Sequence, residues 1–227
     1  MDLKQIYRPI EKDFKKLEMM LKATLRGRNS RVIFEINKFL LGSGGKKLRP
    51  AMVFLAAGAV ARTAAARDPD QKLVDLAAAV ELVHRASLIH DDVIDRAQLR
   101  HSQPTLNHRW GQDVAIAAGD YFYAEAFRLI AACGNFKVID CMGAATKLMC
   151  EGELNQICER GNVGLRKRQY LGMVQKKTAA LFSASCEAGA VLAGADVRHQ
   201  KALKDYGFNF GIAFQVRDDY LDLVGEE

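Results

Sequence analysis

Residues 81–105 of the chain read ELVHRASLIHDDVIDRAQLRHSQPT, and this stretch decides how the rest is interpreted. Its first half is apolar with a helical period, so the stretch is predicted to be helical. On such a helix Asp91 and Asp95 project from one face, one turn apart, with Asp92 beside them. Mg²⁺ relieves the repulsion among such carboxylates, because it prefers carboxylate and phosphate oxygens as ligands. A solvated acidic helix end is the alternative that this segment alone leaves open.

A second segment of the same form lies near the other end of the chain. Residues 214–222 read FQVRDDYLD, in which Asp218 and Asp222 share a helical face and Asp219 stands between them. Two DDxxD segments on apolar helices favour functional sites over two solvated helix ends. Facing each other across a helical bundle, they would hold a cluster of Mg²⁺ ions around a diphosphate.

The pair resembles the two aspartate-rich motifs of the trans-isoprenyl diphosphate synthases, a family of all-α prenyltransferases. The resemblance extends from about residue 40 to the end, and is strongest to long-chain enzymes of the octaprenyl and solanesyl type. It implies an antiparallel helical bundle of the isoprenoid synthase type around a central substrate cavity, and a homodimer. It also implies three Mg²⁺ ions per active site, held by Asp91, Asp95 and Asp218 with support from Asp92, Asp219 and Asp222.

Other segments resemble the substrate-binding motifs of the same family. Residues 44–50, GGKKLRP, match its GGKxxRP motif, in which glycine lets the backbone approach a ligand and the cations bind one diphosphate. Residues 176–190, KKTAALFSASCEAGA, contain its Lys-Thr pair. The resemblance assigns isopentenyl diphosphate to Lys46, Arg49, His84 and His101, and the allylic diphosphate to Arg100, Lys177, Thr178 and Gln215.

The segment RHSQPT, residues 100–105, departs from the family pattern RRGxPT at two positions. His101 stands where a second arginine is usual, and Ser102 replaces the glycine. A neutral histidine binds phosphate less well than arginine does. We therefore expect the His101 contact to isopentenyl diphosphate to be weakened.

Small residues precede the first aspartate segment by about one helical turn. In family members that make short products, bulky aromatic residues close the product tunnel at this place. Ala86 and Ser87 leave it open, which favours a long product, roughly C35 to C50. The alternative is that these small side chains only allow close helix packing.

The 227 residues are expected to form a single prenyltransferase domain. Family members continue well past the second aspartate segment, so the C-terminal helices are expected to be missing, either by truncation or by nature. Helices are predicted over 3–26, from about 33 to Gly42, 51–66, from a cap at Asp68-Pro69 to about Gln98, 110–132, 135–160, 165–193 and 197–224.

The composition bounds the class of protein. A net charge of +6 raises the possibility of nucleic acid, but no groove-reading motif is present and the acidic segments repel phosphate without metal. The longest apolar run, 51–61, is too short to cross a bilayer, so only lipid contact during product release is expected. Early acidic residues argue against a leader, and the 5 cysteines form no CxxC pair, which predicts buried, reduced thiols in a cytoplasmic protein.

The leading functional hypothesis is a Mg²⁺-dependent enzyme that condenses isopentenyl diphosphate with an allylic diphosphate to make a long polyprenyl diphosphate, with octaprenyl as the central value, for quinone side chains. A short-chain farnesyl or geranylgeranyl synthase is an alternative. A terpene cyclase is opposed by the second DDxxD segment and the GGKxxRP turn. A non-catalytic partner subunit of a heteromeric synthase is a further alternative, which the two intact aspartate segments oppose.

Overall fold

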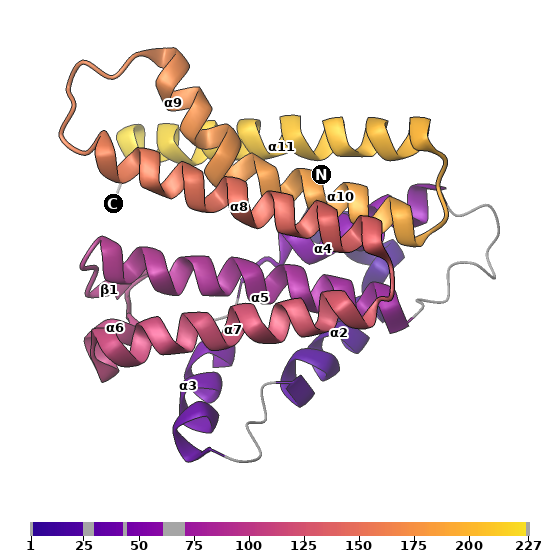
Figure 1. Ribbon diagram of the computed structural model, residues 1–227, viewed down its shortest axis with the longest axis horizontal. Coiled ribbons are helices and arrows are strands. Elements are labelled where there is room, and N and C mark those ends of the chain that lie inside the picture. The colour runs from indigo at the N-terminus through magenta and orange to yellow at the C-terminus, as the bar shows by residue number, and fades with distance from the viewer. Residues whose placement is uncertain (1, 25–29, 43–44, 61–70, 226–227) are drawn as a thin grey trace. The chain divides into compact units, whose positions relative to one another are not determined.

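The structure is a computed structural model, and it describes residues 2–24, 30–42, 45–60 and 71–225. Nearly all of its regular structure is helical, which confirms the predicted all-α class. In chain order the elements are α1 (Leu3–Tyr7), η1 (Arg8–Ile10), α2 (Glu11–Thr24), α3 (Arg31–Gly42), α4 (Leu48–Val60), α5 (Gln71–Ile94), β1 (Leu99–Arg100), β2 (Gln103–Pro104), α6 (Leu106–Trp110), α7 (Gln112–Ala132), α8 (Phe136–Cys158), α9 (Lys167–Val174), η3 (Gln175–Ala179), α10 (Ala180–Leu192) and α11 (Val197–Val224) (Figure 1).

The chain forms two compact units. Unit 1 spans residues 1–51 and 69–133, and therefore contains α1, η1, α2, α3, the start of α4, α5, the β1–β2 hairpin, α6 and α7. Unit 2 spans residues 52–68 and 134–227 and contains the rest of α4 and the helices from α8 to α11. The first aspartate segment lies in unit 1 and the second in unit 2.

In unit 1, α5 lies along α7, and α2 packs against α5 (Figure 1). The core is built from Leu17 and Leu21 of α2, Leu82 of α5 and Phe122 of α7, all almost without exposed surface. A glycine allows the α5–α7 approach, since a Cβ at Gly119 would lie 2.2 Å from Nε2 of His90.

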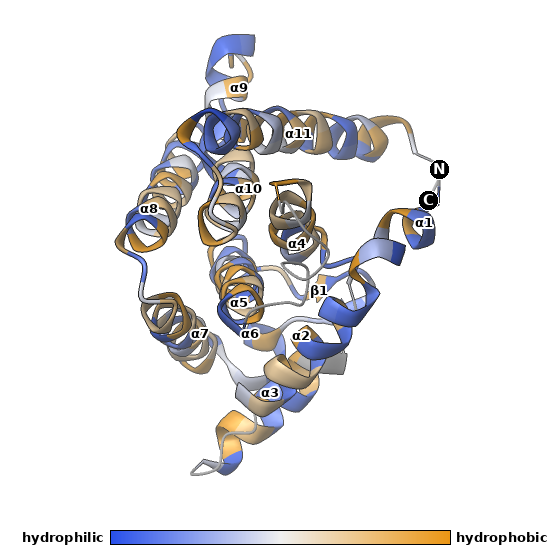
Figure 2. Ribbon diagram, turned by 90° about the vertical axis from the view of Figure 1, so that its right-hand side faces the viewer, coloured by the Kyte–Doolittle hydropathy of each residue, from blue (hydrophilic) through white to orange (hydrophobic). Residues whose placement is uncertain are grey.

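In unit 2, α10 packs against both α8 and α11. Apart from Glu187, the residues of α10 are small or apolar, as expected for a buried helix. Glycines of α11 face it closely, because a Cβ at Gly207 or Gly211 would lie within 2.6 Å of α10 or η3 backbone atoms. The α4 helix is coloured largely as hydrophobic in Figure 2, whereas α2 shows both colours. Gly189 of α10 lies against the Val53 carbonyl of α4.

Four predicted helices are shorter or more broken than the sequence pattern indicated. The helix expected over 3–26 is divided by η1, which contains Pro9. The helix expected from Trp110 is divided by Gly111, whose φ of 89° ends α6 and precedes α7. The helix expected to reach Gln98 ends at Ile94, and the one predicted over 165–193 is interrupted by the π-helical turn η3. The Asp68-Pro69 cap and residues 25–26 and 61–66 lie outside the described residues.

The cysteines are free thiols, as predicted, but the expectation that all are buried is wrong. Cys133 and Cys186 are buried and Cys141 is half-buried, whereas Cys150 and Cys158 are exposed, because they lie on an outward face of α8. Among the described helices, none combines the length and apolar character needed to cross a membrane.

Candidate active site

The first aspartate segment forms the C-terminal end of α5. The Asp95 N–H donates to the Asp91 carbonyl at 2.8 Å, so the two residues are one helical turn apart, as predicted. Arg96 follows with a φ of 53°, and the next amide, of Ala97, donates to the Asp92 carbonyl at 2.9 Å. The Ala97 bond and the bond from the Arg96 N–H to the Val93 carbonyl at 3.1 Å form a Schellman motif, which ends the helix and turns the chain toward the hairpin.

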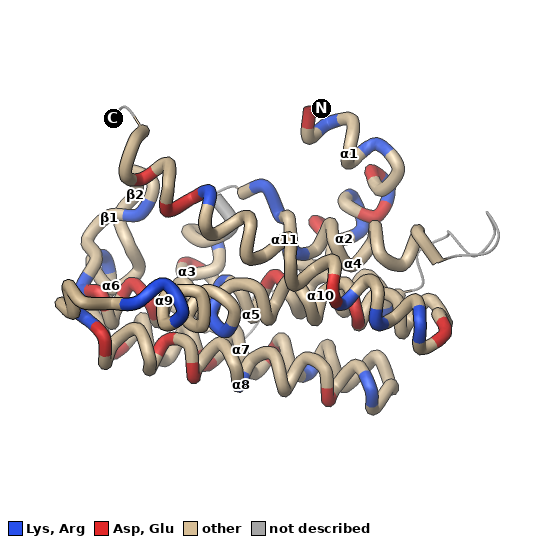
Figure 3. The backbone as a smooth tube through the Cα atoms, turned by 90° about the horizontal axis from the view of Figure 1, so that it is seen from above, with Lys and Arg blue, Asp and Glu red and all other residues tan. Residues whose placement is uncertain are grey.

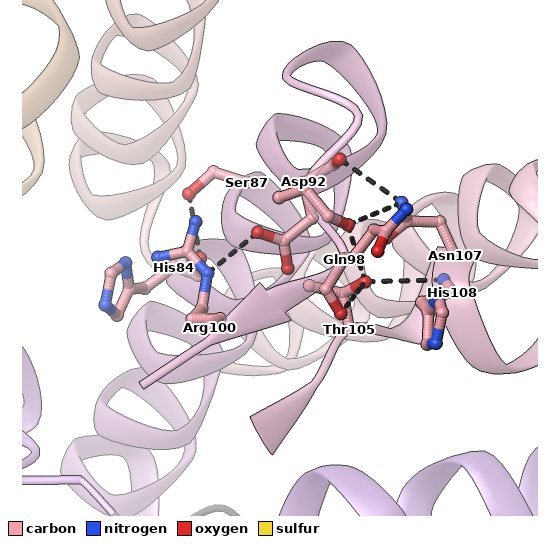
Figure 4. Close-up of polar contacts among 9 residues, drawn as sticks. His84, Ser87, Asp92, Gln98, Arg100, Thr105, Asn107 and His108 are labelled. Atoms are coloured by element: carbon pink, nitrogen blue, oxygen red, sulfur yellow. Dashed lines mark hydrogen bonds and ion pairs between the residues drawn. The ribbon is translucent and has the colours of Figure 1, made fainter. Parts of the chain in front are cut away.

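Asp91 is half-buried and Asp95 is exposed, but Asp92 is only 7% exposed and has a specific partner. Its Oδ1 accepts a hydrogen bond from Nε of Arg100, on β1, at 2.8 Å (Figure 4). Burial raises the pKa of the Asp92 carboxyl, while the bonded guanidinium opposes that rise. Asp92 and Arg100, both predicted site residues, are therefore in contact, and Asp92 positions the Arg100 guanidinium.

The hairpin that carries Arg100 closes with a two-residue loop. Leu99 pairs with Pro104 and Arg100 with Gln103, which leaves His101 and Ser102 as the loop. Their φ values, 47° and 61°, are both left-handed, as a type I′ turn requires. The glycine that Ser102 replaces would adopt this conformation without strain.

Two residues to which the sequence pattern assigned no role hold the base of this hairpin. Thr105 donates its hydroxyl to the Ala97 carbonyl at 2.7 Å, and Asn107 donates Nδ2 to the same carbonyl at 3.0 Å and to the Asp92 carbonyl at 3.3 Å (Figure 4). These bonds fix the segment between Asp95 and Arg100. The Thr105 that follows Pro104 in the RHSQPT segment was the only sequence signal for them.

The basic turn before α4 brings Arg49 to His84. Arg49 Nη1 lies 3.0 Å from His84 Nε2, and since a guanidinium only donates, His84 accepts on a deprotonated nitrogen. Burial, together with Arg49 and two further arginines, Arg85 and Arg100, lowers the pKa of His84 well below its usual value. Lys46, three residues before Arg49, is exposed.

A buried ion pair beside His84 was not predicted. Arg85 and Glu81 are 9% and 6% exposed, and Arg85 Nε donates to Glu81 Oε1 at 2.9 Å. Arg85 Nη1 also donates to the Leu40 carbonyl near the end of α3, at 2.8 Å. Buried charges on a helix were the available signal, because such groups must be paired. The pair links α5 to the helix that precedes the basic turn.

In unit 2 the second aspartate segment joins the Lys-Thr pair through a chain of hydrogen bonds. Thr178 donates its hydroxyl to Gln215 Oε1 at 2.8 Å, and Gln215 Nε2 donates to Asp219 Oδ1 at 2.8 Å. Tyr170 donates its hydroxyl to Asp219 Oδ2. Burial and the Asp219 carboxylate raise the pKa of Tyr170 to about 12, so this hydroxyl remains a donor at neutral pH. Tyr170, on α9, was missed by the sequence pattern.

Lys177, on the π-helical turn η3, contacts α8. Its Nζ is paired with Glu153 and donates to Gln156 Oε1 at 3.4 Å. Gly152 permits this approach, because a Cβ there would lie 2.7 Å from the Lys177 backbone nitrogen. Glu153 and Gln156, two residues of α8, thus hold the lysine in place.

The remaining aspartates of the second segment are more accessible. Asp218 is half-buried and Asp222 is exposed, and they lie on the last turns of α11, where Figure 3 shows acidic residues following a basic one toward the C-terminus. Within the described parts of the chain, no three His, Cys, Asp or Glu side chains are gathered closely enough to hold a metal ion. The carboxylates of Asp91, Asp95, Asp218 and Asp222 nevertheless have the oxygen chemistry that suits Mg²⁺. Asp92 accepts a hydrogen bond from Arg100, and Asp219 accepts hydrogen bonds from Gln215 and Tyr170.

The two small residues proposed to set product length differ in environment. Ala86 has no exposed surface, and Ser87 is half-buried and donates its hydroxyl to the His84 carbonyl at 2.8 Å. Ala86 therefore fits the alternative of close packing, and Ser87 keeps some exposed surface.

Comparison with known proteins decides the family. A family model described as Polyprenyl synthetase matches residues 30–227. The chain belongs to the polyprenyl synthetase family. The resemblance drawn from the aspartate segments is thus confirmed.

Curated relatives of this family member carry several product names. A geranylgeranyl diphosphate synthase of Methanosarcina mazei is 37% identical over 86% of this chain and 60% of its own length. An octaprenyl diphosphate synthase of Escherichia coli is 34% identical over 84% of this chain and 57% of its own length. The chain therefore spans somewhat under two thirds of these relatives.

Solved structures of the family match the fold. A decaprenyl diphosphate synthase from Rhodobacter capsulatus superposes with a TM-score of 0.89 and 34% identity, covering 97% of this chain and 66% of that one. A polyprenyl synthase from Caulobacter crescentus, complexed with calcium and isoprenyl diphosphate, superposes with a TM-score of 0.91 and is 36% identical in sequence. The match covers 99% of this chain and 66% of that one.

Proposed function

We propose that this chain carries the substrate-binding and metal-binding residues of a divalent-metal-dependent prenyltransferase that condenses isopentenyl diphosphate with an allylic diphosphate. The observation that carries the proposal is the family match over residues 30–227, within which both aspartate segments are intact. A structural relative crystallised with calcium and isoprenyl diphosphate supports a divalent cation and a diphosphate ligand.

Asp91, Asp95 and Asp218 are the proposed Mg²⁺ ligands. When bound, Mg²⁺ would neutralise charge on the leaving diphosphate. Arg100, Lys177, Thr178 and Gln215 are proposed to bind the allylic diphosphate, and Asp92 and Asp219 to orient these groups through the bonds described above. Lys46, Arg49 and His84 are proposed to bind isopentenyl diphosphate, with His101 as a weaker contact.

For product length we propose a long chain, roughly C35 to C50 with C40 as the central value. Relatives named octaprenyl and heptaprenyl synthases support this range, whereas the relative named geranylgeranyl diphosphate synthase favours a shorter product. The test is product analysis of the purified chain with isopentenyl diphosphate, Mg²⁺ and allylic primers of different lengths. Products that stop at about C15 or C20 would overturn the long-chain proposal.

The Ala86→Phe/Ser87→Phe double variant tests where product growth stops. If the tunnel passes these residues, the products should shorten to about C15 or C20 while the first condensation survives. Ala86 is fully buried, so Ser87→Phe alone is the control that avoids overpacking the α5 core. Unchanged product length in both variants would place the end of the tunnel elsewhere.

A second candidate function rests on one group of relatives. Proteins named heptaprenyl diphosphate synthase component 2, from Geobacillus stearothermophilus and Bacillus subtilis, are 35% and 33% identical to this chain. Their names indicate multi-component enzymes, so this chain is alternatively one subunit of a heteromeric synthase rather than a homodimer. Steady turnover by the purified chain alone would decide against that alternative.

A further inference from the structure

The basic turn before α4 is held by the N-terminal helices of unit 1. The hydroxyl of Tyr7, the last residue of α1, donates to the Lys46 carbonyl at 2.6 Å. The Tyr7 ring is half-buried and stacks on Phe14 of α2, with ring centroids 4.8 Å apart. The phenol therefore reaches the turn from a ring that is itself fixed by packing.

A second contact joins the same helices to the next residue of the turn. Lys47 Nζ lies 3.6 Å from Glu18 Oε1 on α2. Lys47 has a φ of 47°, a left-handed conformation that costs a non-glycine residue free energy. Its carbonyl also accepts the Ala51 N–H at 3.1 Å, which begins the hydrogen bonding of α4. The turn thus has a conformation that its own sequence does not favour, and contacts from outside must maintain it.

These contacts come from residues that precede the part of the chain matched by the family model, although solved structures of the family cover nearly the whole chain. The match begins at residue 30, whereas Tyr7, Phe14 and Glu18 all precede it. Lys46 itself is exposed, and its carbonyl accepts the Tyr7 hydroxyl. Arg49 follows within the same turn and contacts His84.

We propose that Tyr7 is a positioning residue for the diphosphate-binding turn, and that its hydroxyl orients Lys46 toward the diphosphate of isopentenyl diphosphate by fixing the Lys46 carbonyl. This inference rests on the proposed function, since it assigns a role to Tyr7 within that substrate site. Tyr7 acts through Lys46 and does not itself touch the substrate.

The test compares Tyr7→Phe, which removes only the hydroxyl and keeps the stacked ring, with the parent chain. The matched control is Tyr206→Phe, because Tyr206 is 57% exposed and lies on α11 in the other unit. Calorimetric titration with isopentenyl diphosphate should give a Kd about three- to tenfold higher in Tyr7→Phe, the loss expected for one hydrogen bond. In turnover, KM for isopentenyl diphosphate should rise by the same factor while KM for the allylic primer and kcat stay unchanged.

A double-mutant cycle with Lys46→Ala tests whether Tyr7 affects substrate binding through Lys46. If Tyr7 acts through Lys46, Tyr7→Phe should have no further effect on binding in the Lys46→Ala background. Any one of three outcomes would overturn the inference. They are an unchanged Kd for isopentenyl diphosphate in Tyr7→Phe, a rise in the primer KM equal to that for isopentenyl diphosphate, and an undiminished effect of Tyr7→Phe on that Kd in the Lys46→Ala background. Binding of isopentenyl diphosphate without turnover by the parent chain would reject the proposed function, while the Tyr7 question would still be decided by the titrations. A parent chain that does not bind isopentenyl diphosphate overturns both.

Discussion

The carboxylate of Asp92 lies 2.8 Å from Nε of Arg100, so the middle aspartate of the first segment is already paired without any ligand. The middle aspartate of the second segment, Asp219, is similarly bonded to Gln215 and Tyr170. In both segments the first aspartate is half-buried and the last is exposed. The two segments therefore divide their carboxylates in the same way between positioning and accessibility.

This division predicts different effects for neighbouring substitutions. Asp91→Ala should lower turnover more than tenfold and raise the Mg²⁺ concentration needed for half-maximal activity, with the unfolding temperature nearly unchanged. Asp92→Ala should instead raise KM for the allylic primer and lower stability by about 1 to 3 kcal/mol, because Arg100 loses its buried partner. Magnesium titrations of both variants are the measurement. An equal shift in the Mg²⁺ requirement would show that Asp92 is also a ligand, and an Asp91→Ala loss below tenfold, about 1.4 kcal/mol, would reject its role.

His84 predicts a pH dependence of stability. Its pKa is lowered in the folded state, so below the unfolded value of about 6.5 the unfolded chain binds more protons. The contribution of His84 to stability is therefore complete above about pH 6.5 and is lost as the pH falls toward the folded pKa. The slope is at most about 1.4 kcal/mol per pH unit.

His84→Gln is the matched variant for this measurement, since its amide oxygen accepts from Arg49 without titrating. Urea unfolding between about pH 5 and 7.5 should show the parent losing stability relative to this variant below about pH 6.5. Parallel curves across that range would contradict the assigned protonation state.

The sequence predicted the helices better than their ends. Apolar periodicity located α5, α8 and α11, and the two aspartate segments were enough to identify the family. The hydropathy of a residue, however, carries no information on its backbone φ angle. The break at Gly111, the left-handed Arg96 that ends α5 and the π-helical turn at Lys177 are backbone features that apolar periodicity does not mark.

The site residues show the same difference. Residues that match a motif, such as Arg49 and His84, are found in contact in the structure. Tyr170, Glu153 and Asn107 lie outside any motif and act only through partners distant in sequence, so no local pattern marked them. Partners of this kind are revealed only by the fold.

Ser102→Gly should stabilise the protein. Ser102 has a φ of 61°, and left-handed geometry costs a side-chain-bearing residue about 1 to 2 kcal/mol. The greater freedom of glycine in the unfolded chain offsets part of this, about 0.4 to 1 kcal/mol, which leaves a gain of about 0.5 to 1 kcal/mol. Urea unfolding measures the difference, and Ser102→Ala is the control that keeps the Cβ and should gain nothing. A loss of stability in Ser102→Gly would indicate that the Ser102 side chain has a role of its own.

His101→Arg should tighten binding of isopentenyl diphosphate. His101 is exposed on the same loop, and a permanent planar guanidinium, which can donate two parallel hydrogen bonds to phosphate, would replace an imidazole ring. KM for isopentenyl diphosphate should fall, while KM for the primer should not change. Because His101 also has a left-handed φ, of 47°, the Ser102→Gly background separates backbone strain from the charge effect. An unchanged or raised KM in both backgrounds would remove His101 from the substrate site.

Two glycines of α8 give opposite predictions for the same substitution. At Gly143 a Cβ meets nothing within 4 Å, so Gly143→Ala should stabilise the helix by roughly 0.8 to 1.0 kcal/mol through helix propensity alone. At Gly152 the Cβ would lie 2.7 Å from the Lys177 backbone nitrogen, so α8 and η3 must separate or η3 must shift. Overpacking of this kind typically costs about 1 to 3 kcal/mol.

Since Lys177 lies on the displaced turn, Gly152→Ala should also raise KM for the allylic primer, whereas Gly143→Ala should leave it unchanged. Urea unfolding and primer titration of the two variants decide the matter. If Gly152→Ala binds the primer as the parent does, the position of Lys177 in η3 is not what the allylic diphosphate requires.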